Sequence, residues 1–254
     1  MKLKGKTAVI TGGGSGIGRA IAVVFAQQGA SVCLIDIHRQ AMEEVCTQIK
    51  QHGGACQYYV ADVREQVQVS NTVDQIGPID ILVNNAGVAH VGNIEHCQPD
   101  DFDRVFDVNV KGAYHVLYAV IPVMKSAGGG VILNLASIAS SVGIADRFAY
   151  SMSKGAIHAM SMSIARDYLQ HHIRSNSISP ARVHTPFVDG FIAKNYPDNQ
   201  QEMFERLAAS QPIGRMAQPE EIAQLALFLC SDDASFITGN DYPIDGGFIR
   251  LNNA

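Results

Sequence analysis

The fold of this chain is decided by the stretch Lys6-Thr-Ala-Val-Ile-Thr-Gly-Gly-Gly-Ser-Gly-Ile-Gly18. Its apolar run predicts a short buried strand, its glycines predict a tight turn, and the apolar residues of 20–26 predict a helix. Gly12, Gly16 and Gly18 would let the backbone turn sharply and approach a pyrophosphate at the helix N-terminus, where free N–H groups and the helix dipole favour an anion. The stretch therefore predicts the phosphate-binding turn of a dinucleotide fold.

The next predicted strand, residues 31–36, ends in Asp36, eighteen residues after Gly18. Dinucleotide-binding folds place an acid near this position to accept a hydrogen bond from a ribose 2′-hydroxyl. A 2′-phosphate would be repelled by the same carboxylate, and no basic residue stands at Ser15 or Ile37. With His38 and Arg39 as the only basic residues nearby, the sequence predicts NAD rather than NADP as cofactor.

Short apolar runs alternate with helical patterns along the rest of the chain. Runs that are buried on both faces and joined by helices predict a parallel sheet with right-handed crossovers and helices on both faces. The predicted fold class is α/β: a single doubly wound Rossmann-type domain over residues 1–254, with a central parallel sheet of about seven strands. The predicted strands are Ala8–Ile10, Val32–Ile35, Gln57–Val60, Ile79–Val83, Val131–Leu135, Ser175–Ile178 and Tyr242–Ile244.

One long connection, at about residues 185–218, contains several prolines and the polar stretch Pro197-Asp-Asn-Gln-Gln201. Long connections inside a compact domain are usually functional, so this one is expected to be a mobile substrate lid rather than a domain linker. A variable surface excursion is the alternative.

Composition argues against several classes of partner. The net charge of −5 and pI of about 6.0 offer no electrostatic footprint for nucleic acid or for an anionic membrane. The first strand follows Met1 too closely for a signal peptide, and no apolar run approaches the ~20 residues that span a bilayer. We expect a cytoplasmic protein. Five cysteines without a Cys-x-x-Cys pair predict reduced packing residues, and nine histidines without paired ligand spacing predict no metal site.

The candidate chemistry lies at Tyr150-Ser-Met-Ser-Lys154. A tyrosine and a lysine four residues apart share one helical face, where the ammonium can depress the phenol's pKa. Ser137 follows the apolar run 131–135, at the end of a predicted strand, which is a usual site for chemistry in open α/β sheets. These residues would bring a hydroxyl donor to a tunable acid/base. The alternatives are an exposed Tyr-Lys face without chemistry and a serine that caps a turn.

Taken together, these residues resemble the classical short-chain dehydrogenase/reductase family over nearly the whole chain. A departure is Pro180-Ala181, where the family usually has Pro-Gly. The local patterns 87–92 and 146–150 look like the branch that includes 2-keto-3-deoxy-sugar-acid and cytosolic 3-hydroxybutyrate dehydrogenases. The further matches, all in family order, are Asp62-Val63, Asn84-Asn-Ala-Gly87, Asn109-Val-Lys-Gly112, Thr185-Pro186 and Asp245-Gly-Gly247.

The resemblance implies hydride transfer between NAD and a secondary alcohol or ketone. Tyr150 would be the acid/base and Ser137 would hold the substrate oxygen, while Lys154 would tune Tyr150 and hold the nicotinamide ribose. Asn109 would bind a relay water, although it could instead satisfy backbone groups. Asp62 and Val63 are implied at the adenine, Asn85 near its ribose, and Val183 and Thr185 at the carboxamide. The full predicted cofactor set is Gly12, Ser15, Gly16, Ile17, Gly18, Asp36, Asp62, Val63, Asn85, Tyr150, Lys154, Val183 and Thr185.

Two other functions stay open at this point. One is an NADP-dependent ketoreductase of a free sugar, steroid or acyl thioester. The other is a dinucleotide-binding sensor without turnover, since a fold does not determine function.

The substrate prediction rests on Arg147, three residues before Tyr150. A guanidinium there suits bidentate capture of a carboxylate, so we expect a small hydroxy acid or a 2-keto-3-deoxy sugar acid. Polar residues of the expected lid favour the sugar acid, namely Asn195, Asn199, Gln200 and Gln201. Alternatively, Arg147 pairs with Asp146 or Asp189.

The helix that follows Tyr150 is rich in small residues and methionine over 155–165. Such residues permit close helix packing, and in the resembled family the equivalent helix contacts symmetry mates. We therefore expect a homotetramer, with burial of this helix against its own sheet as the alternative.

Overall fold

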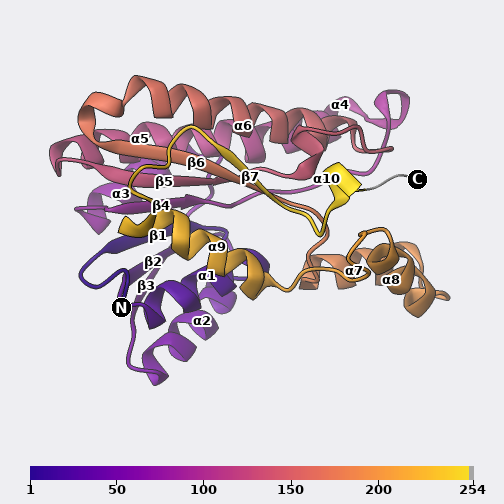
Figure 1. Cartoon of the computed structure of the whole chain (residues 1–254), viewed down its shortest axis with the longest axis horizontal. Helices are drawn as coiled ribbons and strands as arrows, with labels where there is room; N and C mark the ends of the chain where they lie inside the picture. The colour runs from indigo at the N-terminus through magenta and orange to yellow at the C-terminus, as the bar shows by residue number, and fades with distance from the viewer. Residues whose placement is uncertain (252–254) are drawn as a thin grey trace.

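A computed structural model of the chain describes residues 1–251, apart from the side chain of Asn195. Its centre is a seven-stranded parallel sheet with the order β3-β2-β1-β4-β5-β6-β7 (Figure 1). This is the doubly wound α/β fold that the sequence predicts, and all seven predicted strands are present. Their bounds are β1 Thr7–Thr11, β2 Ser31–Asp36, β3 Ala55–Val60, β4 Ile81–Asn84, β5 Gly130–Leu135, β6 Ile173–Pro180 and β7 Asp241–Ile244.

Helices cover both faces of the sheet (Figure 1). One layer holds α1 Gly16–Gln27, α2 Arg39–Gln51 and α9 Pro219–Cys230. The other holds α3 Gln66–Ile76, α5 Gly112–Ser126 and α6 Phe148–Asp167, with α4 Pro99–Phe106 packed on α6. A π-helical turn, Asp107–Lys111, joins α4 to α5, and α10 Phe248–Leu251 follows β7. Within residues 1–251, no helix is both long and apolar enough to cross a membrane.

The core lies in two clusters, one on each side of the sheet. Successive residues of a strand point to opposite faces, so Ile10 packs with the α1/α2/α9 layer while its neighbour Val9 packs with the α3/α5/α6 layer. Leu34 and Ile35 of β2 divide in the same way. Burial on both faces explains why these strands have continuous apolar runs.

The connection between β6 and α9 forms two helices, α7 Pro186–Asn195 and α8 Gln200–Ala209. They lie beside the layered body (Figure 1) and have a small core of their own, built on Ile192, Leu207 and Met216. We call residues 186–209 the α7–α8 segment. It coincides with most of the expected lid.

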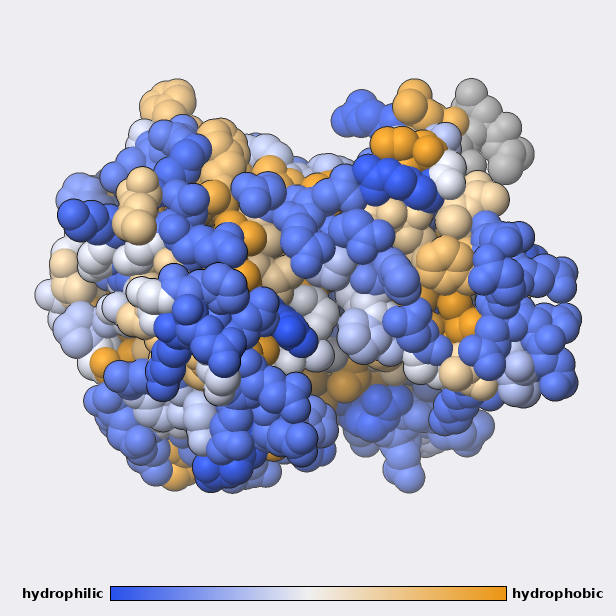
Figure 2. Space-filling model, turned by 90° about the horizontal axis from the view of Figure 1, so that it is seen from below, coloured by the Kyte–Doolittle hydropathy of each residue, from blue (hydrophilic) through white to orange (hydrophobic). Residues whose placement is uncertain are grey.

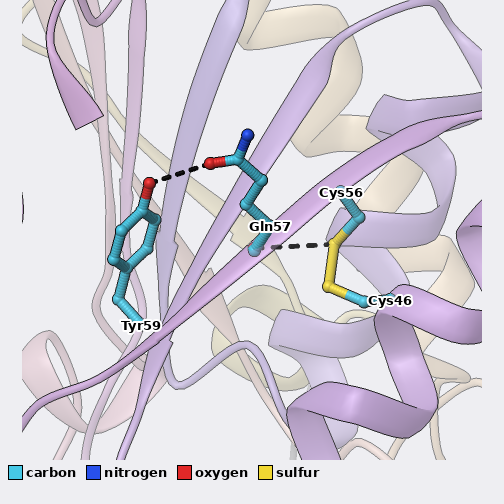
Figure 3. Close-up of a disulfide and its surroundings, with 4 residues drawn as sticks. All are labelled: Cys46, Cys56, Gln57 and Tyr59. Atoms are coloured by element: carbon cyan, nitrogen blue, oxygen red, sulfur yellow. Dashed lines mark hydrogen bonds between the residues drawn. A yellow bond between two sulfur atoms is a disulfide. The ribbon is translucent and has the colours of Figure 1, made fainter. Parts of the chain in front are cut away.

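The prediction that all cysteines are reduced packing residues is wrong for one pair. Cys46 of α2 and Cys56 of β3 form a disulfide (Figure 3). Their Cα atoms are 5.2 Å apart because α2 packs directly on β3, although ten residues separate them in sequence. Cys33, Cys97 and Cys230 are free. No Cys-x-x-Cys signal marks the pair, since only the packing of α2 on β3 brings the two thiols together.

The face that carries α1, α2, α9 and the α7–α8 segment is mostly hydrophilic (Figure 2). Hydrophobic residues on it form small groups between charged and polar ones. The functional residues instead gather at the carboxyl edge of the sheet.

Candidate active site

The glycine turn between β1 and α1 is shaped to receive an anion. Gly12 and Gly16 have positive φ angles of 64° and 51°, which other residues adopt at a cost. A Cβ on Gly18 would lie 2.2 Å from the carbonyl oxygen of Gly12, so the close approach of helix and turn requires glycine there. Ser15 is the N-cap of α1 in extended conformation but makes no side-chain cap hydrogen bond. The turn and the first N–H groups of α1 thus fit a pyrophosphate.

Asn85, directly after β4, holds this turn in place. Its Nδ2 donates to the carbonyl oxygens of Thr11 (2.9 Å) and Gly12 (3.1 Å). Thr11 Oγ1 in turn accepts from the backbone N–H groups of Asn85 (2.9 Å) and Ala86 (3.0 Å). The sequence analysis did not single out Thr11, although a hydroxyl at the end of the first strand was a visible signal.

Asp36 ends β2 beside the same turn. Its carboxylate accepts hydrogen bonds from the backbone N–H groups of Gly14 and His38, each 3.1 Å long. The neighbouring Arg39 is engaged elsewhere, with Nη1 3.4 Å from the hydroxyl of Tyr58 and 4.0 Å from a carboxylate oxygen of Glu43.

Asp62 and Val63 follow β3, on the far side of β2 from the turn. Asp62 binds the guanidinium of Arg64, and these hydrogen bonds hold the pKa of its carboxyl below the usual range. Val63 is buried and packs on Gly112. A Cβ added to Gly112 would lie 2.7 Å from the Cγ2 of Val63. The Val63 carbonyl accepts a hydrogen bond from His115 Nδ1 at 2.9 Å.

Val183 and Thr185 follow β6. Val183 is buried and bridges to Ala217, while Thr185 is the N-cap residue of α7. The Cγ2 of Thr185 would lie 3.4 Å from a Cβ on Gly16. The connection after β6 therefore approaches the glycine turn at Gly16.

Ser137 and Tyr150 meet at the end of β5. The pairing of Leu135 with Ile178 puts Ser137 next to the end of β6, and a hydrogen bond links its side chain to the phenol of Tyr150. Ser137 Oγ also accepts from the backbone N–H of Ala139 at 3.2 Å, so it caps a turn as well. The capping alternative and the contact with Tyr150 are thus both present.

The prediction that Lys154 depresses the pKa of Tyr150 is wrong for this structure. Burial raises the pKa of Tyr150, and the effects that oppose this are the Ser137 hydrogen bond and the charge of Arg147. Lys154 Nζ lies 5.8 Å from the centre of the phenol ring and donates to the carbonyl of Leu135 at 2.6 Å. Burial also lowers the pKa of Lys154 to about 8.

Asn109 lies in the π-helical turn and is buried. Its Oδ1 accepts from the Val88 N–H at 2.7 Å, and its Nδ2 donates to the Val88 carbonyl and to Ser153 Oγ, each at 2.9 Å. Ser153 Oγ donates to the carbonyl of Tyr150 at 2.8 Å. Asn109 is thus tied to the helix that carries Tyr150 and Lys154. The alternative role, satisfying backbone groups, is met at Val88.

Arg147 is the N-cap residue of α6 and makes neither carboxylate pair that the sequence suggested. Its Nη1 donates to the backbone carbonyl of Asp146 at 2.9 Å, and Asp189 is bound instead to His184 Nε2 at 2.9 Å. The sequence analysis missed Arg182, a second arginine at this edge, whose signal was a basic residue a few positions after a predicted strand.

Most of the predicted residues form two groups at one edge of the sheet, while Asp62 and Val63 follow β3 and Val183 follows β6 outside these groups. The first surrounds the glycine turn: Gly12, Ser15, Gly16, Ile17, Gly18, Asp36, Asn85 and Thr185. The second surrounds the phenol: Asn109, Ser137, Arg147, Tyr150 and Lys154. Carboxyl ends of parallel strands meet at the same edge, which is where open α/β sheets bind ligands.

Known proteins match this architecture and sequence. The family model described as enoyl-(acyl carrier protein) reductase matches residues 12–249. A 2-keto-3-deoxy-L-fuconate dehydrogenase from Xanthomonas campestris pv. campestris is 36% identical over 248 residues, which cover 97% of this chain and 81% of that protein.

Two solved structures carry a nicotinamide dinucleotide. An NAD+-bound xylitol dehydrogenase has a TM-score of 0.90 at 35% identity and covers 97% of this chain and 100% of its own. The L-sorbose reductase of Gluconobacter frateurii, complexed with NADPH and L-sorbose, has a TM-score of 0.93 at 31% identity. The match covers 98% of this chain and 99% of the reductase chain. The chain belongs to the short-chain dehydrogenase/reductase family, a family of oxidoreductases whose fold binds a nicotinamide dinucleotide.

Proposed function

We propose that this protein is an NAD-dependent dehydrogenase that interconverts a secondary alcohol and a ketone, with a small hydroxy acid or a 2-keto-3-deoxy sugar acid as substrate. The single observation that carries the proposal is that the half-buried Tyr150 meets Ser137 at the edge of the sheet that also holds the glycine turn. The named activity of the Xanthomonas relative supports the choice of a sugar acid.

Tyr150 acts as the acid/base. In the direction of oxidation it accepts the hydroxyl proton of the substrate, and in reduction it returns that proton. The bound nicotinamide takes up or supplies the hydride at the same carbon. Ser137 donates a hydrogen bond to the substrate oxygen as charge develops on it, an effect that is strongest in a site closed to water.

Lys154 and Asn109 support the site around Tyr150: Lys154 Nζ lies 5.8 Å from the ring centre, and Asn109 is linked to the Tyr150 backbone through Ser153. Lys154, anchored on the Leu135 carbonyl, holds the nicotinamide ribose in this proposal. Asn109 holds the loop at Val88 and contacts α6 through Ser153. In this proposal, Asn109 also binds a water that relays protons between Lys154 and solvent. A lysine whose pKa is about 8 can both give and take a proton near neutral pH.

Asp36 supports NAD over NADP. A 2′-phosphate would meet its carboxylate, and Arg39 is engaged with Tyr58 and Glu43. In Asp36→Ala, we expect the ratio of kcat/KM for NAD over NADP to fall by at least tenfold. Asp74→Ala, which removes an exposed carboxylate from α3, serves as the control and should leave the ratio unchanged. Better efficiency with NADP in the unaltered protein contradicts the cofactor proposal.

A substrate screen tests the reaction itself. Reduction of NAD is measured across hydroxy acids, aldonic and 2-keto-3-deoxy acids, free sugars and steroids, with Arg147→Met in parallel. We expect an acid to be the best substrate and its KM to rise in Arg147→Met. Arg166→Met, an exposed arginine on the same helix, is the matched control. Turnover of none of these alcohols would contradict the proposed function.

We propose further that one domain with a lid at about residues 185–218 forms a homotetramer in the cytoplasm. Side chains on the outer faces of α5 and α6 support the assembly, since Tyr114, Tyr118 and Met162 are large, hydrophobic and exposed. Light scattering at micromolar concentration should give four times the 27.3 kDa chain mass. A monomer would contradict it.

A further inference from the structure

Two arginines lie at the edge of the sheet near Ser137, because α6 and β6 both pack on the Ile138–Ser140 turn that follows it. Arg147 caps the helix that carries Tyr150, and Arg182 follows β6, the strand that pairs with the one ending before Ser137. Arg182 is half-buried. Burial, and secondly the charge of Arg147, lower the pKa of Arg182, which agrees with the placement of both arginines around this turn.

Neither arginine has a carboxylate partner within residues 1–251. Arg182 donates from Nε to Ser210 Oγ at 3.0 Å, and Arg147 donates from Nη1 to the Asp146 carbonyl at 2.9 Å. Arg215, by contrast, makes a bidentate pair with Glu221, with two contacts of 2.7 Å. Arg147 and Arg182 therefore keep guanidinium donors that no carboxylate of the described residues engages.

Arg174 of β6 is also half-buried, and it shows how the fold satisfies the donors of a half-buried guanidinium. Its two Nη atoms donate to the carbonyls of Ile237, Leu229 and Ser231 at 3.0–3.1 Å. Arg182 has a single hydroxyl partner, and its Nη groups make no hydrogen bond within the described chain. A half-buried and under-bonded guanidinium costs free energy that an incoming anion recovers.

The partner of Arg182 is Ser210, the residue that follows the α7–α8 segment at the C-terminus of α8. Ser210 Oγ donates to the Leu207 carbonyl at 2.7 Å and accepts from Gln211 Nε2 at 3.0 Å. Gln211 is buried, and its Oε1 has no hydrogen-bond partner among residues 1–251. Arg182 is thus held at one nitrogen by Ser210, within the connection that the proposed function treats as the lid, while no other residue of the described chain engages its remaining side-chain donors.

We propose that Arg182 and Arg147 form a two-arginine carboxylate site and that Arg182 is the residue that makes the enzyme selective for organic acids. The inference rests on the proposed function, because it places this site beside the reacting carbon. A carboxylate fits better than a phosphate, since one donor nitrogen of each arginine is already engaged and a planar two-oxygen group matches what is left.

The first test measures anion binding without turnover. Malonate, an unreactive dicarboxylate, is titrated calorimetrically into the protein saturated with NADH. We expect Arg182→Gln and Arg147→Gln each to raise the Kd at least tenfold, and Arg182→Lys to raise it less because it keeps the charge. Arg206→Gln, which removes an exposed arginine from α8, is the control and should leave the Kd unchanged. An unchanged Kd in Arg182→Gln, or tighter binding of inorganic phosphate than of malonate, overturns the proposal.

The second test separates selectivity from structure. For the best acid of the substrate screen, Arg182→Gln should raise KM far more than it lowers kcat, whereas KM for butan-2-ol should not change. If kcat/KM falls by the same factor for the acid and for butan-2-ol, Arg182 is only structural and the proposal is overturned. If Arg182→Gln unfolds, Arg182→Lys carries the same comparison. If the unaltered protein binds malonate and Arg182→Gln does not, but no alcohol is oxidised, the proposed function is contradicted and the anion site is still supported.

Discussion

Lys154 Nζ donates a 2.6 Å hydrogen bond to the backbone carbonyl of Leu135, the last residue of β5. The lysine is therefore anchored to the sheet edge rather than to the phenol of Tyr150, one helical turn away. The contact ties α6 to the strand that ends beside Ser137. It also keeps an ammonium group buried, which lowers its pKa to about 8.

The stability of the protein should depend on pH through Lys154. Its pKa is about 8 in the folded protein against an ordinary 10.5, so between these values the unfolded chain binds more protons and the free energy of unfolding rises with pH. The full rise is on the order of 3 kcal/mol. Urea unfolding at pH 8 and pH 10 should show it in the unaltered protein and not in Lys154→Met. Equal pH dependence in both proteins would show that the buried ammonium is not its source.

Replacing Tyr150 by phenylalanine should abolish turnover and spare the cofactor site. The ring keeps its packing, but the proton carrier is gone, and general acid/base catalysis is worth roughly 10²–10⁴-fold. Single-turnover kinetics measure the loss, and NADH fluorescence measures the Kd, which should stay within about twofold. Retained activity would refute the assignment of Tyr150.

Ser137→Ala should move the pH profile as well as the rate. The Ser137 hydrogen bond lowers the pKa of Tyr150 against the raising effect of burial, so its removal should shift the acid limb of alcohol oxidation to higher pH. The rate should fall about 10²-fold or more, because the substrate oxygen loses a donor. A lower rate with an unmoved limb would mean that Ser137 acts on the substrate alone.

Gly18→Ala should unfold the turn or abolish cofactor binding. Its Cβ would lie 2.2 Å from the Gly12 carbonyl oxygen, so either turn or helix must move. Gly190→Ala is the matched control, since its Cβ meets nothing within 4 Å on α7 and should stabilise that helix by up to about 1 kcal/mol. Thermal unfolding and NADH binding report both effects. Normal NADH affinity in a folded Gly18→Ala protein would contradict the close approach.

The Cys46–Cys56 disulfide should contribute to stability without entering the chemistry. Closing a loop of ten residues stabilises by roughly 2–3 kcal/mol in the chain-entropy model. Cys46→Ser should lower the denaturation midpoint accordingly and leave kcat unchanged. The unaltered protein treated with a reductant should match the variant, while Cys97→Ser, which removes a free cysteine, should not. Two additional free thiols in the oxidised, denatured protein would show that the bond is absent.

The sequence by itself determined the sheet and the location of the site. Strands such as β1 and β2 are buried on both faces, so they must be continuous apolar runs that are visible without a structure. Gly12, Gly16 and Gly18 are required by backbone geometry, which is a local property. Residues at or just beyond the carboxyl ends of strands, such as Asp36 and Ser137, must meet at one edge because the strands are parallel.

Only the tertiary structure decided how side chains are paired. The four-residue spacing of Tyr150 and Lys154 places both on one helical face, but the carbonyl of Leu135, from another element, captures the ammonium. Cys46 and Cys56 meet because α2 packs on β3, and Arg182 comes near Arg147 because β6 runs beside β5. These distances depend on the packing of segments distant in sequence, and the charge and pKa of each group depend on those distances.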